Sequence, residues 1–403
     1  MDEGYLSFPL TMSKRIITGI DIGTHAVRVV ITEHPESGGL PHILGVGKSE
    51  SRGLRHGYII SIADAIKSVR AAVEEAEQIS GVHIREAYIS VGGVGLEGTQ
   101  ATGAAIISRA DSEITEADVE RAHRACELNL QNAANKKILH TIPIEYTIDG
   151  KKVYGRPAGM KGLKLEAKCL VVACLDQHLS DLIRAVEEAG IEPIDACASP
   201  IAASFVALTK AQRMAGVVLA NIGAETISLV VYEDGIPISL EVFPTGSTNI
   251  TNDIALGLKI PLEEAEMIKL GRGSHEFPKK KLNDIILARL EDMFSLVIAH
   301  LKRIGKHELL PAGIVLTGGG SGIETLEDFA RAATKLPSKI PNTSIDFTNN
   351  PKSKKQVKDT SWFVAYGLAI WGATNDRPAL RVGAGMFQNL KESLGGLLKQ
   401  LMP

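Results

Sequence analysis

Aromatic residues are scarce in this chain of 403 residues, at 4%, and the formal net charge is only −3. A chain with few rings to stack on bases and no excess of basic residues is not expected to bind nucleic acid. No apolar run approaches the roughly 20 residues of a membrane-spanning helix. Residues 1–12 contain Asp2 and Glu3 but no basic leader. They are therefore expected to form a disordered extension rather than a signal peptide.

Cysteine is also rare. The chain contains Cys126, Cys169, Cys174 and Cys197, with no CxxC pair and no histidine at ligand spacing. This pattern argues against structural zinc. Scattered thiols of this kind are typical of small buried side chains in a reducing compartment.

Two common phosphate-binding motifs are missing. The chain has no GxxxxGK[ST] sequence and no GxGxxG that opens a helix after a strand, so neither a P-loop nor a dinucleotide site is expected. Glycine turns nevertheless follow three apolar strands, at Gly23, Gly223 and 318–320. One such turn alone can be an ordinary hairpin. Three of them, in an alternating β/α chain with two similar halves, predict one nucleotide held in a cleft between the halves.

The first turn also carries a carboxylate. Backbone N–H groups at a glycine turn can hold an anion, because no Cβ keeps the ligand away. Asp21, directly before the turn, can hold a cation through water. Asp21 and Gly23 together predict a hairpin that binds nucleotide phosphates with Mg²⁺.

The C-terminal segment is amphipathic. Apolar residues recur every three or four positions over 386–403, after an expected linker at 373–385. This pattern predicts an interfacial membrane helix. Gly395 and Gly396 each cost about 1 kcal/mol of helix stability, so the helix is expected to fold only on a surface. A helix docked on the protein's own core or on a neighbour is the alternative. The predicted lipid-facing residues are Met386, Phe387, Leu390, Leu394, Leu397, Leu398 and Leu401.

Several sequence blocks are more specific than any single turn. They are HTIPIEYTIDG at 140–150, DIGTHAVRVV at 21–30, PAGMKGLKLE at 157–166, AEMIK at 265–269 and IVLTGGG at 314–320. With the tail, these blocks resemble the FtsA family of bacterial cell division proteins, within the actin/sugar-kinase/chaperone ATPase superfamily. The resemblance covers about residues 13–403, and the block at 140–150 is its most specific part.

The resemblance implies an actin-like α/β fold, with two duplicated lobes around a nucleotide cleft and a small α+β insert. The implied parts are a first lobe at 13–95 and 177–208 with a returning helix at 361–372, the insert at 96–176, a second lobe at 209–246 and 312–360, and its helical subdomain at 247–311.

The resemblance also implies a binding site for ATP and Mg²⁺, with Asp21 holding the metal through water. Asp21, Gly23 and Thr24 would form the first phosphate turn, and Asn221, Gly223 and Ala224 the second. Gly318, Gly319 and Gly320 would lie against adenosine. Glu266 and Lys269 would reach the base and ribose, although an exposed i,i+3 ion pair explains these two nearly as well.

Three departures from the family pattern bear on catalysis. Most members carry Asp at the position of Asn221, and a glycine-rich run is usual where Ala224 and Glu225 stand. Glu225 would repel a triphosphate unless it is turned away. No acid that could orient water lies near Ser199. Because phosphoryl transfer depends on positioning and charge stabilisation, we expect at most a slow ATPase, with ATP serving as a structural clamp.

The implied function is an actin-like protein that polymerises on the cytoplasmic face of the cell membrane at the septum and tethers FtsZ filaments there. Subunit linkage would raise the effective concentration of weak membrane helices. The C-terminal tail of FtsZ would bind the 247–311 subdomain, where Arg289 or Lys302 would suit its acidic character, although a solvated helix face explains both equally well. The insert would contact other subunits and later division proteins. A pilus-assembly-type actin-like ATPase, a small-metabolite kinase and a nucleotide-free scaffold are the alternatives.

Overall fold

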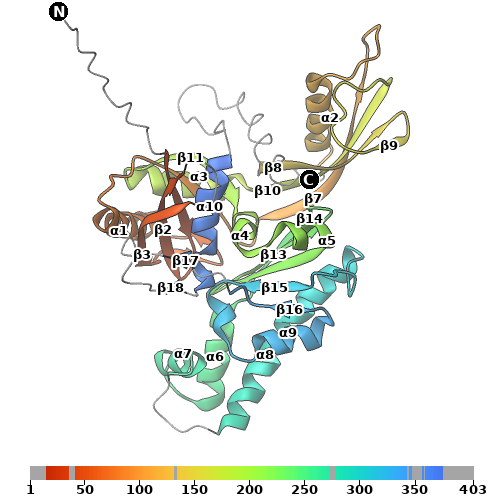
Figure 1. The fold of residues 1–403 in the computed structure, drawn as a ribbon. Helices are drawn as coiled ribbons and strands as arrows, with labels where there is room; N and C mark the ends of the chain where they lie inside the picture. The colour runs from red at the N-terminus through yellow and green to blue at the C-terminus, as the bar shows by residue number, and fades with distance from the viewer. Residues whose placement is uncertain are drawn as a thin grey trace, which may run out of the picture.

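Two sheets form the centre of the computed structural model (Figure 1). The structure describes residues 15–35, 41–130, 134–272, 278–342, 345–346, 356–357 and 359–374. The predicted extension at 1–12 and the predicted membrane helix at 386–403 therefore lie outside the described residues. No helix within the described ranges is long and apolar enough to cross a bilayer.

The first sheet has five strands in the order β11-β6-β1-β2-β3. An antiparallel meander of three strands is joined by two strands parallel to β1. The strands are β1 (Arg15–Ile22), β2 (Ala26–His34), β3 (His42–Glu50), β6 (Glu86–Val91) and β11 (Glu192–Ala198). The short pair β4 (Leu54–Arg55) and β5 (Tyr58–Ile59) follows β3.

Helices cover both faces of this sheet. One face bears α1 (Ile62–Ser80) and α3 (Asp176–Glu188), and the other bears α4 (Ser199–Ala207) and α10 (Phe363–Thr374). Close approach requires glycine, because a Cβ on Gly47 would lie 1.8 Å from the Ala72 carbonyl oxygen of α1. Gly81 caps α1 in the left-handed region at φ 68°.

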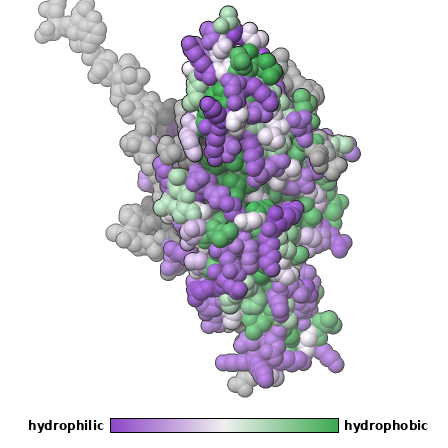
Figure 2. Space-filling model, turned by 90° about the vertical axis from the view of Figure 1, so that its right-hand side faces the viewer, coloured by the Kyte–Doolittle hydropathy of each residue, from purple (hydrophilic) through white to green (hydrophobic). Residues whose placement is uncertain are grey.

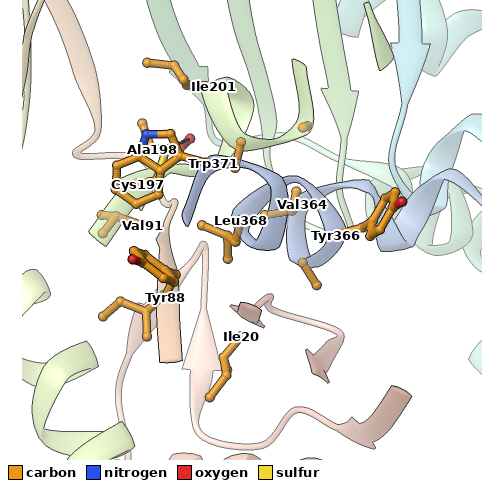
Figure 3. Close-up of a cluster of buried hydrophobic side chains, with 14 of the residues drawn as sticks. Ile20, Tyr88, Val91, Cys197, Ala198, Ile201, Val364, Tyr366, Leu368 and Trp371 are labelled. Carbon is orange, nitrogen blue, oxygen red and sulfur yellow. Dashed lines mark hydrogen bonds between the residues drawn. The ribbon is translucent and has the colours of Figure 1, made fainter. Parts of the chain in front are cut away.

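Helix α10 returns from the far end of the chain to the first sheet. Figure 3 shows Leu368 and Trp371 of this helix among side chains of the strands, with Tyr88 below them. The rings of Tyr88 and Trp371 meet edge to face at 5.6 Å. Because these large side chains are almost fully buried, their packing fixes the C-terminal helix on the first lobe.

The second sheet repeats the plan of the first. Its order begins β16-β15-β12-β13-β14, again an antiparallel meander with two strands parallel to its first member. The strands are β12 (Val217–Ile222), β13 (Ile227–Glu233), β14 (Ile236–Phe243), β15 (Ile314–Thr317) and β16 (Ser338–Lys339). The identical order confirms the two related halves that the sequence predicts.

Helices pack around this second sheet, and α6 (Ser247–Leu258), α7 (Leu262–Lys269) and α8 (Lys279–Arg303) extend to the lower end of Figure 1. Buried residues of α8, including Leu290, Phe294 and Val297, join the core of the second lobe. The others are α5 (Lys210–Ala215), the 3₁₀ turn η1 (Gly319–Gly322) and α9 (Leu326–Thr334). The turn η2 (Thr360–Trp362) precedes α10. The short strands β17 (Ile345–Asp346) and β18 (Gln356–Val357) pair with each other.

The insert lies at the opposite end of the molecule from α6–α8 (Figure 1). Its strands extend the second sheet into nine strands, through the pair Leu240–Gly98 and the hydrogen bond from Gln100 Nε2 to the Ile238 carbonyl at 2.8 Å. Its elements are β7 (Glu97–Ile106), α2 (Glu116–Leu128), β8 (Lys136–Ile148), β9 (Lys151–Val153) and β10 (Lys164–Leu175). All four cysteines are free and buried, as expected.

Candidate nucleotide cleft

A cavity of about 670 Å³ lies between the two lobes. This volume is within the usual range for small-molecule sites. Every residue predicted for the nucleotide site lines it: Asp21, Gly23, Thr24, Asn221, Gly223, Ala224, Glu266, Lys269, Gly318, Gly319 and Gly320. Residues from distant parts of the sequence thus meet around one space.

The first turn joins β1 to β2 at the cavity. Gly23 N–H donates to the Ala26 carbonyl at 3.2 Å, which closes the turn. The Asp21 carboxylate accepts a hydrogen bond from Ser90 Oγ at 2.7 Å. Burial raises the pKa of Asp21, while the Arg28 charge and the Ser90 hydrogen bond oppose this only in part. Asp21 is therefore held in one orientation at the cavity wall.

The second turn, between β12 and β13, has the same geometry. Gly223 N–H donates to the Thr226 carbonyl at 2.8 Å, as Gly23 does in the first turn. The start of α6 supports it, because Ser247 N–H donates to the Gly223 carbonyl at 2.9 Å and Thr248 N–H to the Ala224 carbonyl at 2.8 Å. The two turns face one cavity from corresponding positions of the duplicated sheets.

The third turn packs directly against the second. Gly318 has φ 89°, and a Cβ there would lie 2.4 Å from Asn221 Oδ1. Its carbonyl accepts hydrogen bonds from Ser321 Oγ at 2.8 Å and Thr360 Oγ1 at 3.1 Å. The positive φ of Gly318 and the short distance from a Cβ to Asn221 both require glycine at this position.

Glu266 and Lys269 both line the cavity. They form an ion pair at 2.7 Å, yet the Lys269 side chain is only 5% exposed. Lys269 Nζ also donates to Thr251 Oγ1 at 2.8 Å. Burial raises the pKa of Glu266, but hydrogen bonds from Lys269 and Thr251 outweigh it and hold the pKa below its ordinary value. The pair therefore belongs to the cavity wall, with the Lys269 side chain buried and the Glu266 side chain 43% exposed.

Glu225 is not among the residues that line the cavity. Its carboxylate oxygen Oε2 accepts a hydrogen bond from the backbone N–H of His56 at 2.5 Å. In the neighbouring residue, Gly57 N–H donates to Thr24 Oγ1 at 3.1 Å. The turn at 56–57 thus links the turn at Gly23 to the turn at Gly223, and the Glu225 carboxylate is engaged by the backbone of the first lobe.

Arg28 is a cavity residue that the sequence analysis missed. Its side chain lines the cavity, and the residue is only 9% exposed. The guanidinium lies over the Trp362 ring, 5.8 Å from the ring centre. A charged residue between Val27 and Val29, in an otherwise apolar strand, was the available sequence signal. Lys48 and Arg272 also line the cavity.

The two residues predicted for FtsZ do not lie together. Arg289 forms an ion pair with Asp253, with Nη2 2.9 Å from Oδ1, and Lys302 is exposed near the end of α8. Thirteen residues along a helix place them about 20 Å apart and about 140° apart around its axis. One short segment of a bound peptide cannot contact both, and neither residue lines the cavity.

The residues of the cleft fit a nucleotide better than a protein-held metal. Within the described ranges, no group of three or more His, Cys, Asp or Glu could hold a metal ion. Asp21 and Asn221 line the cavity, so Mg²⁺ fits as an ion held by phosphates, with one carboxylate available for its bound water.

Comparison with known proteins identifies the family. Residues 218–367 match the family model "Cell division protein FtsA", and residues 93–173 match "SHS2 domain inserted in FTSA". The cell division protein FtsA of Pseudomonas aeruginosa is 31% identical over 350 residues, with 81% of this chain and 83% of the relative covered. The chain belongs to the FtsA family. FtsA of Borreliella burgdorferi is also 31% identical, over 89% of this chain and 91% of the relative.

Solved structures show the same fold at lower identity. A PilM–PilN type IV pilus biogenesis complex matches with a TM-score of 0.67 and 18% identity, over 89% of this chain and 99% of that chain. MreB5 of Spiroplasma citri, solved with bound ADP, matches with a TM-score of 0.50 and 14% identity, over 89% of this chain and 97% of that chain. These likenesses confirm the actin-like α/β fold. This FtsA family member is thus an actin-like cell division protein.

Proposed function

We propose that this protein binds ATP between its lobes, polymerises along the cytoplasmic face of the cell membrane, and tethers FtsZ filaments there during septum formation. One observation carries the nucleotide part of the proposal, namely that all residues predicted for the nucleotide site line one cavity between duplicated lobes. Membership of a cell division family supports the cellular role.

In this proposal ATP is mainly a structural clamp. The turns at Gly23 and Gly223 hold the phosphates, Gly318 to Gly320 lie against adenosine, and Asp21 holds a Mg²⁺-bound water. Ser199 lines the cavity where an acid would orient attacking water, and a hydroxyl is a poor base. Hydrolysis is therefore slow, and the bound nucleotide holds the lobes in the geometry that subunits need to join.

Exposed apolar side chains on the insert support self-association. Hydrophobic surface is visible among hydrophilic side chains at the upper end of the face in Figure 2, where the insert lies. The exposed residues of the insert include Ile106, Leu128, Tyr154 and Leu163. Exposed apolar surface can mark contacts between proteins, here with a second subunit or with a later division protein.

We infer that the segment 386–403 binds the membrane and that the 247–311 subdomain receives the FtsZ tail. The apolar stripe from Met386 to Leu401 supports the first inference, and the resemblance supports the second. Lys302 is the better candidate for an acidic peptide, since it is exposed, whereas Arg289 already pairs with Asp253.

Lipid-monolayer electron microscopy tests the whole proposal. The full chain with ATP is expected to form filaments on the monolayer and to recruit FtsZ. A chain without 386–403 should leave the lipid, and Asp21→Ala should prevent filaments. Unchanged liposome binding by the truncated chain would favour the pilus-assembly alternative. Rapid ATP turnover stimulated by a small alcohol would favour the kinase.

A further inference from the structure

A hairpin tip formed by His56 and Gly57 lies between the two glycine turns of the cleft. Strands β4 and β5 pair Arg55 with Tyr58, so these two residues form the whole loop. Both have positive φ, 49° for His56 and 85° for Gly57, as a tight two-residue hairpin loop requires. The hydrogen bond of such a turn joins the residues that flank the tip. The N–H groups of the two tip residues are therefore available to other parts of the chain.

These two N–H groups bind one side chain from each lobe. His56 N–H donates to the Glu225 carboxylate at 2.5 Å, and Gly57 N–H donates to Thr24 Oγ1 at 3.1 Å. Thr24 belongs to the first turn, and Glu225 directly follows the second. Because the two donors are on consecutive residues, a shift of one moves the other with it.

Thr24 is the side chain of this group that faces the ligand site. It lines the cavity, whereas His56 and Glu225 do not. A hydroxyl has one hydrogen to donate and two lone pairs that accept. The Gly57 N–H occupies one lone pair of Thr24 Oγ1, and within the described ranges no acceptor takes the hydroxyl hydrogen. This hydrogen therefore points away from Gly57 and is available to an oxygen atom of a ligand in the cavity.

The hairpin that carries the tip is fixed on the first lobe. The backbones of Gly57 and Gly93 are in close contact, because a Cβ on Gly57 would lie 2.4 Å from Gly93 Cα. The ring of Tyr58 meets the ring of His178 edge to face at 4.8 Å. The first lobe thus holds the body of the hairpin, and Glu225 holds its tip from the second lobe.

We propose that Glu225 is a positioning residue for nucleotide binding: it holds the hairpin tip so that Gly57 N–H directs the Thr24 hydroxyl to a phosphate oxygen. This inference rests on the proposed nucleotide site. It makes affinity depend on a carboxylate that does not line the cavity. Electrostatics alone predicts the opposite effect, since removing a negative charge near an anion site strengthens the binding of phosphates. The sign of the change in affinity therefore separates the two explanations.

Calorimetric titration of Mg-ATP into the full chain tests the proposal. Glu225→Ala should raise the dissociation constant about tenfold, the size expected for one hydrogen bond to a charged group. Glu225→Gln keeps an acceptor without the charge and should remain within about threefold of the wild type. Thr24→Val removes the hydroxyl from a side chain of the same shape. In that background Glu225→Ala should add a loss of less than about twofold, because the group through which it acts is gone.

Glu233→Ala is the matched control. Glu233 also belongs to the second lobe, is partly exposed, and pairs with Lys306 outside the cavity. This variant should bind ATP as the wild type does, and circular dichroism at the titration temperature checks that every variant is folded. Wild-type or tighter binding by Glu225→Ala would overturn the inference and leave the nucleotide site in place. A full loss in the Thr24→Val background, or an equal loss in Glu233→Ala, would overturn it too. No ATP binding by the wild type would overturn the proposed function itself.

Discussion

Glu225 and His56 join the two lobes beside the cleft, through a hydrogen bond of 2.5 Å from the His56 backbone N–H to the Glu225 carboxylate. Glu225 belongs to the second lobe, and His56 belongs to the turn between β4 and β5 of the first. His56 adopts φ 49°, a backbone region that is unfavourable for a residue with a Cβ. The hydrogen bond to Glu225 helps to offset this cost and fixes the turn against Thr24.

Replacing Glu225 tests this contact. Glu225→Ala removes the acceptor and should lower the free energy of unfolding by about 1–2 kcal/mol, the usual range for a part-buried hydrogen bond to a charged group. Glu225→Gln keeps a side-chain oxygen and should lose less than about 1 kcal/mol. Urea unfolding followed by circular dichroism measures both. Equal stability of the two variants and the wild type would show that the contact adds nothing.

The two glycine turns of the cleft could be predicted from sequence because their requirements are local. A tight turn after an apolar strand needs glycine, and Gly23 and Gly223 show this directly. The direction of Glu225 could not be predicted, since its partner His56 lies 169 residues away. The position of Arg28 in the cavity wall could not be predicted for a related reason, because the pattern of a strand does not show which face of the sheet borders the cleft.

Gly318 is expected to be intolerant of a side chain. A Cβ there would lie 2.4 Å from Asn221 Oδ1 and from the Ile222 carbonyl oxygen, at φ 89°. Gly318→Ala should therefore lower the free energy of unfolding by about 2 kcal/mol or more and weaken ATP binding. Gly322→Ala is the matched control, since a Cβ on Gly322 has no neighbour within 4 Å. Thermal unfolding without ATP compares the stability of the two, because Gly322 also lines the cavity, and similar losses in both would contradict the steric explanation.

Lys269 should matter for nucleotide affinity rather than for surface charge alone. Its ammonium group is buried at the cavity wall and bonded to Glu266 and Thr251. Lys269→Met leaves Glu266 without its counter-ion beside the ligand, so ATP affinity should fall by about tenfold or more. Lys302→Met removes an exposed lysine outside the cavity and should leave ATP affinity unchanged. Calorimetric titration of both variants measures this, and equal effects would indicate a general loss of positive charge.

Buried histidines should make the fold sensitive to acid. Burial lowers the pKa of His140 to about 4, and its Nε2 accepts a hydrogen bond from the Ala198 N–H at 3.1 Å. The unfolded chain binds a proton near pH 6.5, whereas the folded chain does so only near pH 4. Stability from the neutral ring is therefore present above about pH 6.5 and is lost as the pH falls from there towards about 4. Between about pH 7.5 and 5, one such histidine accounts for a loss of about 2 kcal/mol.

His140→Gln isolates this contribution, because glutamine keeps an acceptor for the Ala198 N–H but does not titrate. The variant should lose about 2 kcal/mol less than the wild type over the same pH interval. His123, whose pKa burial also lowers to about 4, keeps part of the acid sensitivity in the variant. His42→Gln removes an exposed histidine of β3 and should reproduce the wild-type pH dependence. The urea unfolding midpoints of the wild type and both variants, measured at each of the two pH values, give these changes in stability. An identical pH dependence in His140→Gln and the wild type would mean that His140 is protonated in the folded state, or that acid opens the core around Trp371 before this histidine titrates.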